Sequence, residues 1–138
     1  MLSIGSLSKQ TGVKIPTIRY YEQIGLIEST ERTLGNQRRY TVEVLQQLRF
    51  VKHARELGFP IKSIQALMDL NSHPDRSCAE ATSIAKEQLV DVRARIASLL
   101  RLESELVRIV EGCSGEGVAS DCYVLASLAN HEHCQLPH

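Results

Sequence analysis

The chain of 138 residues has no Trp and few other aromatic residues, two Phe and four Tyr. Because aromatic side chains supply much of the volume of many cores, this scarcity argues against a large monomeric core. No apolar run approaches the ~18 to 20 residues of a membrane span. The N-terminus also lacks the basic and then apolar pattern of a signal peptide. We therefore expect a cytoplasmic protein with no membrane partner.

Pro and Gly are also missing from the interior of residues 77–112, the longest uninterrupted helical pattern in the chain. Ser77 followed by Glu80 predicts a capping box at its start, and Gly112 is expected as the C′ residue that ends it. An apolar stripe at steps of three and four is typical of a coiled-coil seam. We expect an antiparallel homodimer whose interface contains Leu89, Val92, Ile96 and Leu99.

The chain has four Cys, which in the cytoplasm are expected as ligands or reduced thiols. Cys78 falls in the first turn of the long helix and Cys113 just past its end, so roughly 50 Å separates them. In an antiparallel pair, Cys78 of one chain would meet Cys113 of the other, and a short loop could return Cys122 to the same place. The pattern predicts two three-thiolate metal sites per dimer. The alternative is that each Cys is a small buried hydrophobe.

The net charge of zero hides an uneven distribution along the chain. Residues 1–72 hold ten Lys/Arg and six Asp/Glu, a net +4, whereas residues 73–138 hold six and ten, a net −4. An anionic partner is therefore expected for the first half alone.

Two short helices are expected at residues 4–11 and 16–23, joined by a tight turn at Gly12. Pro16 suits the first position of the second helix. The arrangement predicts a helix-turn-helix, although a plain helical hairpin has the same pattern. The second helix would present four residues to DNA, namely Lys14, Thr17, Arg19 and Tyr20.

A hairpin is expected next, with strands at residues 26–28 and 37–41 around a polar loop. It is Arg-rich, as a wing that grips phosphates would be, and a solvated loop is the alternative. Its expected DNA-contacting residues are Arg32, Arg38, Arg39 and Tyr40.

Further helices are expected at residues 42–57 and 61–70, followed by a linker. The domain plan is thus a DNA-binding domain over 1–72, a dimerisation helix over 76–112 and a metal-binding segment over 113–138. That segment holds a loop, a short helix at 122–130 and a tail with additional candidate ligands, namely His131, His133, Cys134 and His138.

Five short motifs stand out along the chain, at residues 4–8 (IGSLS), 17–22 (TIRYYE), 25–27 (GLI), 38–40 (RRY) and 57–59 (LGF). Together they resemble the MerR family of transcription regulators. The resemblance covers the whole chain and implies a mainly α fold. It implies a winged helix-turn-helix domain, a long antiparallel coiled-coil dimerisation helix, and a short C-terminal metal-binding loop and helix. It also implies no enzymatic activity, with double-stranded promoter DNA and RNA polymerase as partners.

Within that family the cysteine pattern is similar to the metal sensors. Sensors of divalent ions have a Cys where Cys78 stands, whereas copper and gold sensors have Ser. The zinc sensors carry two adjacent Cys and a His in the binding loop, but here Ser114 follows Cys113 and no His precedes Cys122. The spacing is closer to the cadmium/lead and mercury sensors, which use three thiolates. Since soft thiolates prefer such ions, the expected effector is Cd, Pb or Zn, with Hg(II) as an alternative.

The family resemblance also implies a mechanism. Family members bind promoters whose two recognition elements are too far apart for polymerase, and the metal-bound dimer bends and untwists that DNA. A regulator of the same fold that uses its cysteines as a redox switch is a second alternative. A small-molecule sensor would need a larger C-terminal domain, and a thiol enzyme would need a His beside Cys113 or Cys122. A purely structural coiled coil is disfavoured by the Arg-rich wing.

Overall fold

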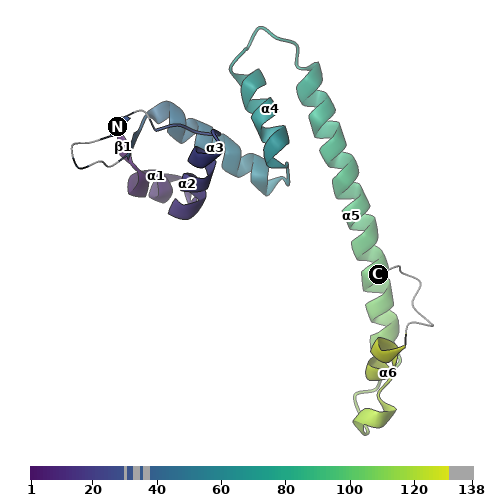
Figure 1. Cartoon of the computed structure of the whole chain (residues 1–138). Coiled ribbons are helices and arrows are strands. Elements are labelled where there is room, and N and C mark those ends of the chain that lie inside the picture. The colour runs from purple at the N-terminus through teal and green to yellow at the C-terminus, as the bar shows by residue number, and fades with distance from the viewer. Residues whose placement is uncertain (30, 33–34, 36–37, 131–138) are drawn as a thin grey trace. The chain divides into compact units, whose positions relative to one another are not determined.

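A computed structural model describes residues 1–29, 31–32, 35 and 38–130 (Figure 1). The chain divides into two compact units, Met1–Ala85 and Lys86–His138. The boundary between the units falls within the long helix, and residues around the start of that helix line a groove of the first unit. Cys78 and Ala81 line that groove together with Phe50 and Leu67.

The first unit is built from helices with a small sheet at its edge. Its elements are β1 (Leu2–Ser3), α1 (Ile4–Thr11), α2 (Ile15–Gln23), β2 (Glu31–Arg32), β3 (Arg38–Tyr40), α3 (Val42–Glu56) and α4 (Ile61–Asn71). The predicted helices are confirmed to within one residue at each end, because their start and stop residues carry local signals. The Ser3 hydroxyl accepts from the Ser6 N–H and caps α1, and the Thr41 hydroxyl accepts from the Val44 N–H and caps α3.

The turn between α1 and α2 is fixed by side chains. Gly12 takes φ 76°, which favours glycine, and its N–H bonds to the Ser8 carbonyl. The Ser8 hydroxyl donates to the Val13 carbonyl at 2.6 Å. The Lys52 ammonium of α3 donates to the Thr11 carbonyl at 2.9 Å. These contacts hold the two helices as a helix-turn-helix.

The sheet differs from the predicted hairpin. Its strands run in the order β1-β3-β2, with Leu2 opposite Tyr40 and Glu31 opposite Arg39. The sequence did not predict β1, and the expected strand at 26–28 is wrong. There the chain turns tightly after α2, with Gly25 at φ 80°, and the Leu26 N–H bonds to the Tyr21 carbonyl at 2.8 Å.

One core holds the first unit together. Residues 26–27 are apolar because they enter this core and not because they form a strand. The fully buried side chains come from every helix of the unit and from the turn and the sheet, namely Leu7, Ile18, Ile27, Tyr40, Leu48, Val51 and Ile64.

The second unit holds most of α5 (Ala79–Glu111), then η1 (Ala119–Asp121) and α6 (Tyr123–Ala129). Three end signals of α5 differ from expectation. Cys78 directly precedes the helix instead of lying in its first turn, and its carbonyl accepts from the Thr82 N–H. Ser77 does not form the predicted capping box with Glu80, since its hydroxyl accepts from the Ala79 N–H. Gly112 does not take the left-handed conformation expected of a C′ glycine. Across the described part of the chain, no helix combines the length and apolarity needed to cross a membrane.

Candidate functional site

The expected recognition helix α2 presents its predicted residues on its outer side. Lys14, Arg19 and Tyr20 are exposed, and Thr17 is half-buried. Ile18 on the opposite side is fully buried. The helix therefore has one face committed to the core and one that carries two cations and a phenol. Such a face can contact base edges and phosphates in a DNA groove.

The expected wing is formed by β2 and β3. Arg32 lies opposite Arg38 in the antiparallel register, and Arg39 lies opposite Glu31. Arg39 is half-buried, whereas the side chains of Arg32 and Arg38 lie outside the described part of the structure. The register thus pairs two arginine positions across a two-stranded ribbon that follows the helix-turn-helix.

Tyr40 requires a correction. The sequence assigned it to the DNA-contacting surface, but its side chain is 0% exposed. Its hydroxyl donates to the Glu22 carboxylate at 2.8 Å, and Glu22 lies near the end of α2. Tyr40 therefore joins the wing to the recognition helix from inside the unit. Alternation along β3 sends Arg39 to the other face of the sheet.

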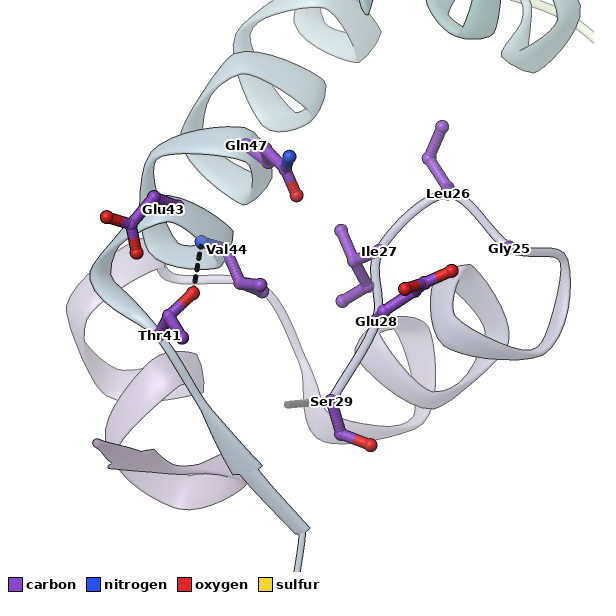
Figure 2. A pocket seen from close by; sticks show the side chains of 9 residues that line it. All are labelled: Gly25, Leu26, Ile27, Glu28, Ser29, Thr41, Glu43, Val44 and Gln47. Atoms are coloured by element: carbon purple, nitrogen blue, oxygen red, sulfur yellow. Dashed lines mark hydrogen bonds between the residues drawn. The ribbon is translucent and has the colours of Figure 1, made fainter. Parts of the chain in front are cut away.

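A cavity of about 520 Å³ lies between the turn after α2 and the start of α3 (Figure 2). It is lined by Gly25, Leu26, Ile27, Glu28, Ser29, Thr41, Glu43, Val44 and Gln47. Two of the described lining residues, Glu28 and Glu43, carry carboxylates. Carboxylates repel the phosphates of DNA, so these two residues do not suit phosphate contacts.

Two of the predicted thiol ligands lie together in the second unit. Cys113 and Cys122 are reduced, and their Sγ atoms are 3.8 Å apart. Cys113 follows the end of α5, and Cys122 directly precedes α6. The loop of residues 114–121 between them makes a full reversal, helped by two left-handed glycines, Gly115 and Gly117. The predicted return of Cys122 to Cys113 is thus observed.

The surroundings of Cys113 favour its thiolate. A hydrogen bond from the Gly115 N–H is the largest effect that lowers the pKa of the Cys113 thiol, followed by the hydrogen bond with the Cys122 thiol. Burial opposes these two effects and raises the pKa, and the N–H groups of Tyr123 and Val124 lower it further by smaller amounts. A thiolate is the form that binds a metal ion.

The third predicted ligand, Cys78, lies at the start of α5. It is exposed and reduced, and 33 helical residues separate it from the loop that carries Cys113. Among the described residues of this single chain, no three His, Cys, Asp or Glu side chains gather closely enough to hold a metal ion. His131, His133, Cys134 and His138 lie outside the described residues.

The spacing of the two thiols fits a metal site. With metal–sulfur bonds of about 2.3 Å and tetrahedral angles, two thiolates on one Zn²⁺ lie about 3.8 Å apart. The observed separation of the Cys113 and Cys122 sulfurs is 3.8 Å. Soft sulfur donors suit Zn, Cd, Pb or Hg better than hard cations. The pair is therefore ready to supply two of the ligands of such an ion.

Three residues around the thiol pair were not singled out as functional from the sequence. The Tyr123 ring lies against Gly112, and the Arg108 guanidinium stands 5.8 Å from the ring centroid. Arg108 also donates to the Tyr123 hydroxyl and to the Glu105 carboxylate. That carboxylate raises the pKa of Arg108 above its already high value, so the guanidinium stays charged. The sequence contained one indication of their role: Gly112 directly precedes one thiol ligand, and Tyr123 directly follows the other.

The predicted dimer seam is exposed on α5. Leu89, Ile96 and Leu99 are 46%, 51% and 63% exposed, and Val92 is half-buried. Towards the end of the helix a shallow groove of about 680 Å³ is lined by Leu99, Leu102, Glu103, Leu106, Val107, Val110 and Glu111. An apolar stripe of this extent on one helix marks an interaction surface.

The helix-turn-helix, its wing and the long exposed helix define a winged helix-turn-helix regulator with a protein-interaction helix. Two family descriptions match the chain, "MerR HTH family regulatory protein" over residues 2–71 and "MerR, DNA binding" over residues 45–109. The chain belongs to the MerR family. It is therefore a DNA-binding transcription regulator and not an enzyme.

Individual relatives span nearly the whole chain. The HTH-type transcriptional regulator ZntR of Escherichia coli K12 is 40% identical over 93% of this chain and 92% of its own length. The mercuric resistance operon regulatory protein of Pseudomonas fluorescens is 37% identical over 92% and 87%. The structure of PbrR691 from Ralstonia metallidurans CH34 in complex with lead(II) matches with a TM-score of 0.79 and 30% identity, covering 93% of this chain and 99% of that one.

Proposed function

We propose that this regulator responds to a soft divalent metal ion, Zn, Cd or Pb, with Hg(II) as an alternative effector, by binding it to thiolates. The observation that carries the proposal is the approach of the Cys113 and Cys122 sulfurs to 3.8 Å beside the end of α5. The similar proteins include a mercuric resistance regulator and a regulator solved with lead(II). The proposed outcome is activation of metal-resistance or efflux genes.

The complete site is proposed to require two chains. Cys113 and Cys122 would come from one chain and Cys78 from its partner, because α5 is roughly 50 Å long and keeps its two ends apart. An antiparallel homodimer through Leu89, Val92, Ile96 and Leu99 brings opposite ends of the two helices together. Their aliphatic side chains, exposed in the single chain, would leave water in that dimer.

DNA binding is proposed to use the outer face of α2 and the wing. Lys14, Thr17, Arg19 and Tyr20 would enter the DNA groove, while Arg32, Arg38 and Arg39 would contact phosphates. Tyr40 is left out of this set because it is buried. The partners are then double-stranded promoter DNA and the RNA polymerase that uses it, and such a partner places the protein in the cytoplasm.

The response is proposed to select one of two dimer states. A bound soft cation supplies a link between thiolates of two chains. Cys78 directly precedes α5 and lines a groove with Leu67 and Leu70 of α4. Binding of Cys78 to a metal ion shared with the partner would therefore move α4, the last helix of the DNA-binding unit. A ligand that binds only one state shifts the equilibrium towards it, and this coupling links the site to the DNA.

A mixed dimer tests the composition of the site. One subunit carries Cys78→Ser, and the other carries Cys113→Ser together with Cys122→Ser. The cross-chain arrangement predicts one tight metal site per dimer, since all three thiols survive at one end. A site that took Cys78, Cys113 and Cys122 from one chain predicts none, because each chain has lost at least one of these ligands. Equilibrium dialysis of the purified heterodimer measures the stoichiometry, and zero tight sites would refute the cross-chain assignment.

The same thiol pair also favours a second candidate, a redox-sensing regulator. Two reduced thiols 3.8 Å apart need little movement to form a disulfide. Thiol titration with and without metal separates the two functions. Metal protection of three thiols per chain against alkylation supports metal sensing. Loss of two thiols on mild oxidation, with a change in operator binding and no effect of metal, supports the redox switch instead.

A further inference from the structure

We infer that Gly112, Tyr123 and Arg108 form a positioning clamp that holds Cys122 beside Cys113, so that the two thiols are paired before any ligand arrives. The clamp itself is inferred from the geometry around the end of α5, whereas its role in metal binding rests on the proposed function. None of the three clamp residues is proposed to touch the metal.

The clamp begins with a close approach between two residues that flank the thiols. A Cβ atom built on Gly112 would lie 2.0 Å from Cδ1 and 2.2 Å from Cε1 of Tyr123. No side-chain carbon approaches another so closely, so the ring occupies the space that any other residue at 112 would need. Tyr123 directly follows Cys122 and is the first residue of α6. The seat of the ring therefore sets where α6, and with it Cys122, begins.

The far end of the same ring is held by charge. Arg108 lies one helical turn before Gly112 on α5, and its guanidinium donates to the Tyr123 hydroxyl. Glu105 accepts from the same guanidinium, and its side chain is only 16% exposed. The guanidinium also lies 5.8 Å from the ring centroid, within the range of a cation–π contact. The ring is thus fixed at its edge by glycine and at its hydroxyl by arginine.

The loop between the two thiols does not by itself fix Cys122 beside Cys113. The backbone of residues 114–121 turns at Gly115 and Gly117, where a built Cβ meets nothing within 4 Å. The described side chains of η1 are exposed. Without the ring on Gly112, Cys122 would be held near Cys113 by the loop and by the hydrogen bonds of the Cys113 thiol with the Tyr123 and Val124 N–H groups. The freedom of a loop with two glycines would then loosen the pair.

Gly112→Ala is a sharp test because its backbone allows alanine. Gly112 does not take a left-handed conformation, and alanine is a better helix former than glycine. The substitution should therefore preserve or strengthen the end of α5 while it displaces the ring. Ser104→Ala, at an exposed position of the same helix, is the matched control. Tyr123→Phe keeps the ring and removes only the hydroxyl that Arg108 holds.

The first readout needs no metal. In a full-length background with Cys78→Ser and Cys134→Ser, diamide oxidises the two remaining thiols. One S–S bond forms as two protons and two electrons pass to diamide, which becomes the hydrazine. Since small displacements of reacting groups cost large factors in rate, Gly112→Ala should slow this intramolecular closure roughly tenfold or more. Tyr123→Phe should slow it less, and Ser104→Ala should leave it unchanged.

The second readout is metal affinity in the dimer with all its cysteines, measured by Zn²⁺ competition with a chromophoric chelator. Residues that orient ligands typically change affinity by about 10–100-fold, and Gly112→Ala should do so. Circular dichroism and binding of operator by the apo protein should stay as in the parent, which shows that the variants fold. Unchanged closure in Gly112→Ala would overturn the clamp, whatever the metal affinity of that variant. Slower closure with unchanged affinity, in a parent that binds Zn²⁺, would keep the positioning and overturn its proposed purpose in metal binding. If the parent binds no metal while closure still slows, the positioning stands and the proposed metal function fails.

Discussion

The Tyr40 hydroxyl of β3 donates a hydrogen bond of 2.8 Å to the Glu22 carboxylate at the end of α2. This bond joins the wing to the recognition helix. Both elements are proposed to contact DNA at once, so their relative placement decides whether the contacts are made together. A bond between them preorganises the surface and lowers the cost of binding.

Tyr40→Phe removes this hydroxyl and keeps the ring in the core. A hydrogen bond to a charged group contributes about 1.5–3 kcal/mol, so the free energy of unfolding should fall by about that amount or less. Operator affinity should fall as well, since the wing loses its tie to α2. Urea unfolding and gel-shift titration measure the two effects. Tyr20→Phe, at an exposed ring, is the control for stability, and equal stability of the Tyr40 variant would refute the role of the bond.

Arg38→Ala tests the wing. A residue that contacts phosphate contributes to affinity without reading the sequence, so the variant should bind all DNA sequences more weakly. Its slope of log affinity against log salt should be smaller by about one unit. Arg93→Ala on α5, exposed and outside the DNA-binding unit, should behave as the parent. An Arg38 variant with unchanged affinity and salt slope would remove the wing from the proposed surface.

Ile96→Asp tests the dimer. The Ile96 side chain is 51% exposed in the single chain, and in the proposed seam it would be covered by the partner. A carboxylate there would lose its water, which costs several kcal/mol unless it is paired. Sedimentation analysis should show a monomer at micromolar concentration, with Arg95→Asp on an exposed position as control. A parent protein that sediments as a monomer would contradict the antiparallel dimer.

The pH dependence of metal binding follows from the lowered pKa of Cys113. Below the pKa of the Cys113 thiol a proton competes with the metal ion, so metal affinity should rise with pH. Once the pH exceeds the pKa of Cys113 in the folded protein, this thiol should no longer contribute to the pH dependence of the affinity. The folded pKa of the Cys113 thiol is lowered from its ordinary value, mainly by the hydrogen bond from the Gly115 N–H. The lowered pKa also affects the stability of the apo protein. The Cys113 thiolate stabilises the folded state at pH values above the pKa of this thiol in the unfolded chain. This stabilisation is lost as the pH falls through the pKa of the thiol in the folded protein.

Chelator competition at a series of pH values measures this dependence. Thiolate absorbance of the apo protein that keeps only Cys113 and Cys122 gives the first thiol pKa independently. The two should agree in showing one thiolate formed below the usual range. Metal affinity that does not change between mildly acidic and alkaline pH would contradict thiolate coordination.

Helices were largely predictable from the sequence because their signals are local. The Ser3 and Thr41 caps, the left-handed Gly12 and the unbroken pattern of α5 each act within a few residues, and the bounds agree closely with the structure. Family membership was likewise predictable from short motifs. The spacing of the cysteines placed Cys113 past the end of the long helix, because helix rise per residue is fixed, and it allowed a short loop to return Cys122. The structure decided that Cys122 does return, with the two sulfurs 3.8 Å apart.

Tertiary structure decided what depends on contacts between distant residues. Leu26 and Ile27 have the apolar pattern of a strand, yet they turn into the core because the backbone closes on Tyr21. Tyr40 sits among arginines in sequence, but pairing with β1 and the bond to Glu22 bury it. The seat of the Tyr123 ring on Gly112 joins residues eleven positions apart, and neither residue type alone signals it. Burial and close approach depend on which elements meet, and local propensity does not contain that information.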